Sequence, residues 1–430
     1  MAQTSNIAAQ VMTDQELWAD FNALCDCGGR LAGTESENRA FAFLEGRAEA
    51  ATQLSGRSIT VPYGGWSAKN ASLRLQGGQW VGCHALLRSV ATPQAGLTAE
   101  VVDLGRGTLE EFVAHAADIS GRIALVRHEL MFSAGTIHRR RKYLAALERG
   151  AVGFLIAGPI PGQTVAGSCG RQDGPGIPAA GITPEAAAAL RRNARGWATA
   201  TLRIETEERP AETRTLLFDL PGRTDEWVVL SAHVDGHDGS ESAMDNASGL
   251  AAVLAVLRAL ALQVKDFRRG VRLALFSVEE WALTGSAQYV ASLSQAERRT
   301  IALNVNLDCV GGSPNLTALT SGFAALEPFL LRVAERSGVR LRTVRPLFAN
   351  SDHANFALAA IPAFRLVAGF DDPNANVAHV LTPSDTRNKV RESELKQAAA
   401  LSAAIVAEAC NALPQDALEW RQAHGPQPSA

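Results

Sequence analysis

Three short apolar runs, each followed directly by residues that could bind a metal ion, most constrain the fold of this chain. The runs are WVVLSA at 227–232, VRLALFSV at 271–278 and IALNVNL at 301–307, and they lead to His233, to Glu279 and Glu280, and to Asp308. Apolar runs of this length that alternate with helix-period stretches predict buried parallel strands. We therefore predict an α/β fold with a doubly wound, mostly parallel sheet and helices on both faces.

The ends of these strands predict where a site lies. In open α/β sheets, ligands bind in the crevice outside the carboxyl ends of the strands, so we expect the polar side chains that follow the three runs to converge there. A fourth run, PAFRLV at 362–367, is predicted to be a further strand whose following loop returns over the same edge. The sequence thus predicts one polar crevice in a buried sheet.

The run HVDGHDGSESAMDNASG at 233–249 contributes two of the candidate acids. Asp235 stands two residues after His233, where its carboxylate could accept the second ring N–H, as acids beside metal-bound histidines commonly do. Asp245 precedes an apolar stretch that predicts an amphipathic helix, and a helix N-terminus favours an ionised carboxylate. Both acids are therefore candidates for a metal centre.

The adjacent pair Glu279–Glu280 fits a division of roles. Neighbouring side chains on a chain leaving a strand diverge, so one can bind metal while the other stays free as a general base. Carboxylates and imidazoles that share one bridging acid are what a two-metal hydrolytic site requires, and zinc suits such mixed ligands. Each motif alone is weak evidence, and their position at successive strand ends makes the set stronger.

Five motifs resemble the co-catalytic zinc peptidases of family M28, which include aminopeptidases and carboxypeptidases. They are HVDG, MDNASG, FSVEEWALTGS, NLDCVGG and SDHANFALAAIPAF, and the resemblance covers about 1–80 and 206–412. The resemblance implies the zinc exopeptidase fold and two Zn²⁺ ions, with Mn²⁺ or Co²⁺ as alternatives. It also implies a metallo-exopeptidase, in the first place an aminopeptidase that hydrolyses peptide bonds with a di-zinc-activated water.

The resemblance also implies a role for each motif residue. His233 and Asp308 would bind one zinc, Asp245 would bridge, and Glu280 with a downstream histidine would bind the other. Glu279 would be the general base and Asp235 the acid that orients His233. Three alternative functions share this site: a carboxypeptidase, a deacylase of amino-acid conjugates and a metal-poor homologue that acts as a binding module or receptor.

The sequence departs from the family at the last ligand. That histidine usually stands in a His-Thr-x-x-Asp-Thr run, whereas LTPSDT has Leu381 at the matching position and His379 two residues earlier. We predict that His379 takes over this role and points toward Glu280. The alternative is a second metal site that is weakened or has other ligands.

Other histidines near the motifs have less definite roles. His353 in SDHANF is predicted to lie exposed at a helix start capped by Ser351 or Asp352, where it would bind substrate or orient a ligand, and the alternative is a packing residue. His237 and Asp238 are predicted to line the cleft without being required as ligands.

A second domain is predicted within the catalytic one. Residues 85–205 contain the apolar runs AEVVDLG, GRIALVR, AVGFLIAG and GIPAAGI, and they resemble the protease-associated (PA) domain that several members carry as an insertion. We expect a smaller α/β domain without catalytic residues, with 1–84 and 206–412 forming the catalytic domain and 413–430 a tail. The basic run at 138–142 is interpreted as a solvated helix face. The alternative is that this run binds an acidic group of the substrate.

Composition narrows the class of partner. The chain has 41 Lys and Arg against 44 Asp and Glu, a net charge of −3, which does not favour nucleic acid as a partner. The 6 cysteines form no CxxC pair and no disulfide framework, and no secretory signal is visible, so we expect a cytoplasmic protein. No membrane partner is expected, because the apolar stretch at 249–264 is short and interrupted by Arg258. A peptide or amino-acid conjugate is the expected substrate, and homo-oligomerisation is compatible with the sequence.

Overall fold

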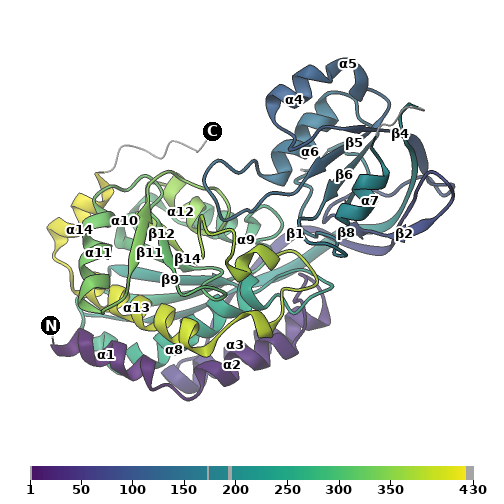
Figure 1. Ribbon diagram of the computed structural model, residues 1–430. Helices are drawn as coiled ribbons and strands as arrows, with labels where there is room; N and C mark the ends of the chain where they lie inside the picture. The colour runs from purple at the N-terminus through teal and green to yellow at the C-terminus, as the bar shows by residue number, and fades with distance from the viewer. Residues whose placement is uncertain (1, 172–173, 192–195, 423–430) are drawn as a thin grey trace. The chain divides into compact units, whose positions relative to one another are not determined.

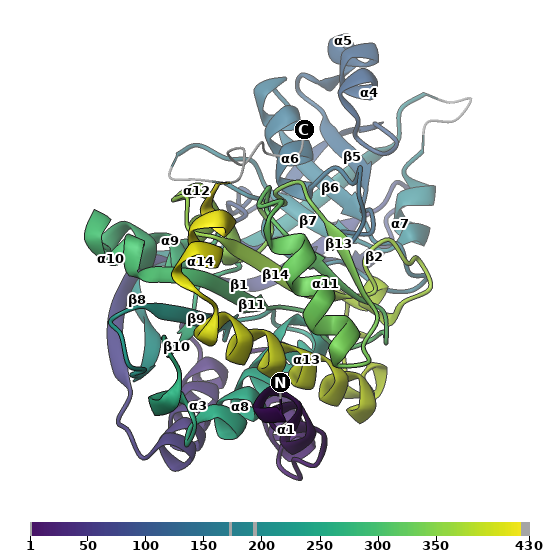
Figure 2. The same ribbon diagram turned by 90° about the vertical axis from the view of Figure 1, so that its left-hand side faces the viewer.

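The computed structural model describes residues 2–171, 174–191 and 196–422 and divides into two compact units. The first unit comprises Met1–Tyr63, Glu212–Val380 and Asp385–Ala430, and the second comprises Gly64–Ala211 and Leu381–Ser384. Figures 1 and 2 show the elements of both units. All residues of the predicted catalytic set lie in the first unit.

The centre of the first unit is a sheet of four parallel strands in the order β14-β11-β9-β10. These strands are β9 (Trp227–His233), β10 (Gly270–Phe276), β11 (Ile301–Leu307) and β14 (Ala363–Ala368). The sheet is extended by β12 (Leu316–Leu319) and β13 (Leu341–Val344) beyond β14 and by residues 216–220 of β8 (Thr199–Leu220) beyond β10. β8 runs antiparallel to β10 and β12 runs antiparallel to β14, while β12 and β13 are parallel, so the predicted, mostly parallel sheet is confirmed.

Helices cover both faces of this sheet, as predicted. One face carries α8 (Ser248–Leu260) and α13 (Glu392–Asn411), with α1 (Ala2–Met12), α2 (Leu17–Asp26) and α3 (Glu35–Thr52) packed outside them. The other face carries α9 (Thr284–Ser292) and α12 (His353–Leu358), and both views agree in this arrangement (Figures 1 and 2). The remaining helices of the unit are α10 (Gln295–Thr300), α11 (Leu326–Arg336) and α14 (Pro414–Arg421).

Helix α8 differs from the amphipathic helix expected after Asp245. Every residue from Ser248 to Leu257 is buried, because α8 lies between the sheet and the outer helices α1, α2, α3 and α13. The stretch Ala243–Leu260 is long and apolar enough to cross a membrane by composition, yet 83% of it is buried inside the protein. It is therefore the central core helix of the unit.

The second unit has its own sheet and core. Its strands pair in the order β4-β5-β6-β7-β3, formed by β4 (Leu97–Asp103), β5 (Ile123–Arg127), β6 (Gly153–Ala157), β7 (Ala179–Ile182) and β3 (His84–Ala85). Helices α4 (Leu109–Ala114), α5 (Ala116–Ile119), α6 (Arg139–Glu148) and α7 (Pro184–Ala189) complete it. The central strands β5, β6 and β7 are almost wholly buried, so this small sheet supplies an independent core.

The boundaries of the second unit differ from those read from the sequence. The sequence pattern predicts two short strands near 57–62 and 71–75, whereas the structure has one long strand, β1 (Arg57–Arg74), which pairs with the short β2 (Trp80–Gly82) and with β8. Because β1 and β8 both continue from one unit into the other, the second unit begins at Gly64 and not at residue 85. In the predicted tail, Pro414–Arg421 forms α14, and residues 423–430 lie outside the described chain.

The basic run at 138–142 is solvated only in part, because Arg141 is exposed while two of its cations are buried. Arg139 and Lys142 are buried at the start of α6, with 5% and 1% of their surfaces exposed. Arg139 donates to the carbonyl of Ser168, and Lys142 donates to the carbonyl of Arg127 and to Glu129. These cations hold loops of the second unit, because their long apolar stems can be buried while their charged ends meet acceptors.

Candidate metal centre

Three predicted ligands meet at the carboxyl end of the sheet. His233 Nε2 lies 3.1 Å from Asp245 Oδ1 and 3.5 Å from Asp308 Oδ1, and one ligand atom from each residue falls within 4.8 Å of the other two. In a tetrahedral zinc site with bonds of about 2.0–2.1 Å, neighbouring ligand atoms are about 3.3 Å apart. The three side chains are therefore already spaced as ligands of one ion.

Strand register places two of these ligands together. β9 ends at His233, which pairs with Phe276 of β10, while Ser231 of β9 pairs with Asn306 of β11. Asp308 follows two residues after Asn306, so it stands level with His233 on the neighbouring strand. Because the strands are parallel and in register, the candidate ligands that follow them in the sequence come into contact.

Asp235 orients His233 in a different way from the one predicted. The ring Nδ1 of His233 meets the backbone carbonyl of Asp235 at 2.9 Å, whereas the carboxylate of Asp235 is 3.8 Å away. That carboxylate instead accepts the backbone N–H groups of Glu279 and Glu280, each at 3.1 Å. Asp235 therefore links the end of β9 to the segment that carries both glutamates.

Asp245 is held by the loop that contains the Asp-Thr part of the LTPSDT run. Asp385, 1% exposed, accepts the N–H of Met244 at 2.7 Å and that of Asp245 at 3.3 Å. Burial raises the pKa of Asp385 to about 7. Asn246 Oδ1 accepts the N–H of Gly249 in the first turn of α8 at 3.0 Å, so the helix starts just after the candidate bridging acid.

Asp308 has a buried cationic partner that the sequence did not indicate. Arg365 Nη2 lies 3.1 Å from Asp308 Oδ2, and both side chains are 3% exposed. Burial by itself raises the pKa of Asp308, but the charges of Arg365 and His233 hold that pKa well below its usual range. Asp308 is therefore an ionised carboxylate, the form that binds a metal ion.

Glu279 is buried near the cluster of His233, Asp245 and Asp308 but is not one of its three members. Only 8% of the residue is exposed, and burial, followed by the charges of Glu280, Asp352 and Asp308, raises its pKa well above the usual range against the opposing effect of His233. A carboxyl group with a raised pKa near a metal centre is what a general base requires. This environment supports the predicted division of roles between Glu279 and Glu280.

The imidazole beside Glu280 is that of His237. His237 Nε2 lies 2.7 Å from Glu280 Oε2, and 5% and 10% of these side chains are exposed. His379 is the last residue of a 3₁₀ turn, Asn376–His379, where burial and then Lys389 lower its pKa. Burial raises the pKa of Glu280, the charge of His237 opposes this shift, and the charge of Asp245 adds to it. The assignment of His379 as a ligand stays a prediction.

A buried arginine from the N-terminal segment shapes the loop that carries His237. Arg30 is 0% exposed and hydrogen-bonds the carbonyl groups of five residues: Leu24, Gly28, Val234, Glu241 and Ser242. A Cβ placed on Gly29 would lie 1.8 Å from the carbonyl oxygen of His237, so only glycine fits there. The two chain segments are therefore locked together at close range.

His353 differs from the exposed helix-start histidine expected in SDHANF. It is 0% exposed, and burial lowers its pKa to about 3. His353 therefore matches the alternative of a packing residue. Its neighbour Asp352 is also fully buried, makes no helix-capping hydrogen bond and has its pKa raised to about 7, chiefly by burial. Asp352 adds negative charge near Glu279 and was recognised from the sequence only as a candidate cap.

The donors present fit a metal ion. His233 Nε2, Asp308 Oδ1 and Glu280 Oε1 are buried polar atoms that make no hydrogen bond among the described residues. Such atoms are costly to bury without a partner, and a divalent cation would satisfy them. The mixed imidazole and carboxylate set matches the ligand preferences of zinc.

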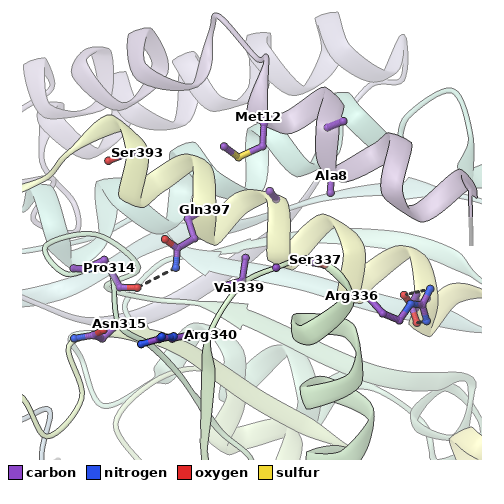
Figure 3. Close-up of a pocket in the computed structure, with 14 residues that line it drawn as sticks. Ala8, Met12, Pro314, Asn315, Arg336, Ser337, Val339, Arg340, Ser393 and Gln397 are labelled. Carbon is purple, nitrogen blue, oxygen red and sulfur yellow. Dashed lines mark hydrogen bonds and ion pairs between the residues drawn. The ribbon is translucent and has the colours of Figure 1, made fainter.

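A cavity elsewhere in the first unit is separate from these residues. It has a volume of about 740 Å³ and lies between α1, α11 and α13, where Gln397 donates to the carbonyl of Pro314 at 2.9 Å (Figure 3). None of the predicted site residues lines it. The candidate centre is thus identified by converging ligands and not by cavity size.

Comparison with known proteins identifies related sequences for both units. Residues 215–406 match the model of peptidase family M28, and residues 93–190 match the model of the PA domain. The chain is similar to aminopeptidase YwaD of Bacillus subtilis, with 26% identity over 89% of this chain and 81% of that protein. It is also 28% identical to the probable lipoprotein aminopeptidase LpqL of Mycobacterium tuberculosis, over 68% of this chain and 61% of that relative.

A solved structure shares the fold. The crystal structure of BSAP, a zinc aminopeptidase from Bacillus subtilis, superposes with a TM-score of 0.73 at 24% identity, over 93% of this chain and 98% of that one. At this identity the likeness establishes the architecture. The chain spans less than two thirds of the length of LpqL, so activity has to be argued from the centre itself.

Proposed function

Since this chain belongs to peptidase family M28 and carries a PA domain, we propose that it is a zinc-dependent aminopeptidase that uses two metal ions. The observation that carries the proposal is the ligand set of His233, Asp245 and Asp308 beside a buried Glu279 with a raised pKa. The names of YwaD and LpqL as aminopeptidases support the choice of the amino end of a peptide as the point of attack.

The residues of the centre have distinct tasks in this proposal. His233 and Asp308 would hold one zinc ion, Asp245 would bridge, and Glu280 would hold the other. Bound zinc supplies Lewis-acid polarisation of the scissile carbonyl and lowers the pKa of a water molecule. Among the acids, Asp245 is kept in place by the Asp385 carboxylate and Asp308 by the Arg365 guanidinium.

Glu279 moves the proton. Its carboxylate accepts a proton from the attacking water, and the buried surroundings that raise its pKa favour keeping that proton until the leaving amine takes it. The N–H of Glu279 donates to Asp235, which fixes the backbone that carries the carboxylate. The position of the base is therefore set by the strand that also carries His233.

The proposal is tested with the purified full chain. Zinc is removed with a chelator and restored, and hydrolysis is measured on aminoacyl p-nitroanilides, on peptides blocked at the amino end and on N-acyl amino acids. We expect activity that requires a free α-amino group, is lost with the metal and returns with zinc. Hydrolysis of amino-blocked peptides from the carboxyl end, or of N-acyl amino acids alone, would assign a carboxypeptidase or a deacylase instead.

A further inference from the structure

We infer that His237 supplies the imidazole of the second metal site and so replaces the ligand that the LTPSDT run lacks. This inference rests on the proposed zinc dependence and concerns which of this chain's residues hold the second ion. Sequence reasoning assigned that place to His379, and the structure provides a different imidazole that is already in contact with Glu280.

The position that usually carries the last ligand cannot serve here. Leu381 has an apolar side chain, is 5% exposed and has a φ of 66°, and its carbonyl accepts the N–H of Ala166 at 2.7 Å. Ser384 of the same run accepts a hydrogen bond from Gln163 at 2.7 Å. The segment Leu381–Ser384 is therefore used as a structural part of the second unit.

His237 has the contacts expected of a ligand in the pair. Its Nε2 faces Glu280 Oε2 at 2.7 Å, while the other oxygen of Glu280 is buried without a hydrogen bond. An imidazole nitrogen and a carboxylate oxygen that bind one zinc ion are about 3.3 Å apart, so only a small separation is needed to admit the ion. Asp245, which would bridge, is among the charged groups that act on Glu280.

The loop of His237 is constructed to hold the ring in place. The N–H of His237 donates to Ser242 Oγ at 3.1 Å, and the carbonyl groups of Val234, Glu241 and Ser242 are fixed by Arg30. A metal ligand on a preorganised loop loses less conformational entropy on binding than one on a free loop. The backbone around His237 is thus already restricted before any ion binds.

The chemistry of the remaining donors also requires an imidazole here. With Asp245 and Glu280 alone, the second ion would be bound only by carboxylates and water, a set that suits magnesium or manganese better than zinc. Adding His237 gives that site the same mixed nitrogen and oxygen donors as the site of His233, Asp245 and Asp308. Two sites of matched chemistry then share the single bridging acid.

The test measures metal content. The full chain and the variants H237Q, H237A and H379Q are stripped with a chelator, reloaded with Zn²⁺, desalted and analysed for zinc per chain. The absorption spectrum after loading with Co²⁺ reports the ligands of each ion independently of activity. We expect two zinc ions in the wild-type chain and in H379Q, one in H237Q and H237A, and a changed Co²⁺ spectrum only in the two His237 variants.

Several outcomes overturn the inference. Two zinc ions in both His237 variants, or loss of one ion in H379Q but not in H237Q, would assign the second site to other residues. One ion in the wild-type chain would mean that no second site exists, while the proposed zinc dependence would survive. No ion in the wild-type chain would refute the proposed function itself. Far-UV circular dichroism of the metal-free variants separates loss of a ligand from loss of the fold.

Discussion

The carboxylate of Asp235 accepts the backbone N–H of Glu279 at 3.1 Å, so the segment after β9 fixes the segment after β10. The same carboxylate accepts the N–H of Glu280, and the backbone carbonyl of Asp235 meets the ring of His233. One residue thus sets the relative position of His233, Glu279 and Glu280, the proposed imidazole ligand, base and carboxylate ligand. Its substitution is expected to affect all three.

We expect Asp235→Asn to lower kcat and zinc affinity by about 10–100-fold, the usual effect of losing a group that orients ligands. Asparagine has one side-chain oxygen, so it cannot accept both N–H groups in the same geometry. The measurement is kcat together with zinc titration. Asp225→Asn, at an exposed acid, is the control and should leave both unchanged. Unchanged values for Asp235→Asn would leave the backbone contacts without a functional role.

Glu279→Gln should separate proton transfer from metal binding. We expect kcat to fall by about 10²–10⁴-fold, as for the loss of a general base, with zinc content unchanged. Glutamine also removes a carboxyl group that burial disfavours when charged, so the melting temperature should stay the same or rise. The exposed Glu335→Gln is the matched control. A kcat close to the wild-type value with full metal content would exclude Glu279 as the base.

Arg365→Met should destabilise the metal-free protein by about 3–5 kcal/mol, because Asp308 would remain as a buried charge without its partner. Zinc should restore part of this loss, since the ion binds only the folded chain and supplies positive charge beside Asp308. Denaturant unfolding with and without zinc provides the measurement. Arg342→Met removes an exposed ion pair with Asp371 and should cost less than about 1 kcal/mol. Equal effects of the two variants would contradict the role of Arg365.

The second unit should have an acid-sensitive ion pair. Lys142 Nζ contacts Glu129 Oε2 at 2.5 Å, with 0% and 15% of the side chains exposed. Burial opposes ionisation of both groups, yet Lys142 and Arg106 lower the pKa of Glu129, while burial lowers the pKa of Lys142. The shift of Glu129 favours its charged form, whereas that of Lys142 disfavours its charged form, because Lys142 is the more deeply buried group. The loss of stability at acidic pH is therefore expected to follow the protonation of Glu129, whose carboxyl retains access to water.

The pKa of Glu129 is lower in the folded chain than in the unfolded chain. The ion pair therefore stabilises the fold fully above the unfolded pKa of about 4.3, and this stabilisation is lost as pH falls through the folded pKa. We expect Glu129→Gln to destabilise the second unit at pH 7 but to differ little from wild type in the acid range below that window. Thermal unfolding at several pH values tests this. The double variant Glu129→Gln, Lys142→Met should regain stability, because no buried charge is left unpaired. A loss that is independent of pH would point to packing instead.

The sequence predicted those parts of the molecule that depend on local pattern. The four parallel strands and the residues at their ends follow from apolar runs and from the rule that ligands collect at the carboxyl edge of such a sheet. The long strand β1 is predicted as two short strands, and its exposed and buried residues alternate irregularly in the structure. The sequence also did not predict how fully α8 is buried, because a helix's own residues do not show how many other helices pack around it.

Contacts between distant loops could not be predicted. His237 meets Glu280, and Arg365 meets Asp308, only because separate strands end at the same edge, and nothing local distinguishes these residues from surface charges. The sequence left the exposed and packing alternatives for His353 open for a similar reason, because its burial depends on the helix that it starts packing against β14 and β11. The identity of the second imidazole is therefore a question that required coordinates.

The five backbone carbonyls that accept hydrogen bonds from Arg30 define how far this chain can be shortened without losing the proposed centre. The family match begins at residue 215, which suggests a minimal fragment that starts there. Such a truncation would remove the guanidinium that templates the loop of His237 and would leave the carbonyls of Val234, Glu241 and Ser242 without their donor. The N-terminal segment is thus a scaffold for the proposed metal centre, and a shortened chain would have to retain it or replace Arg30 by redesign.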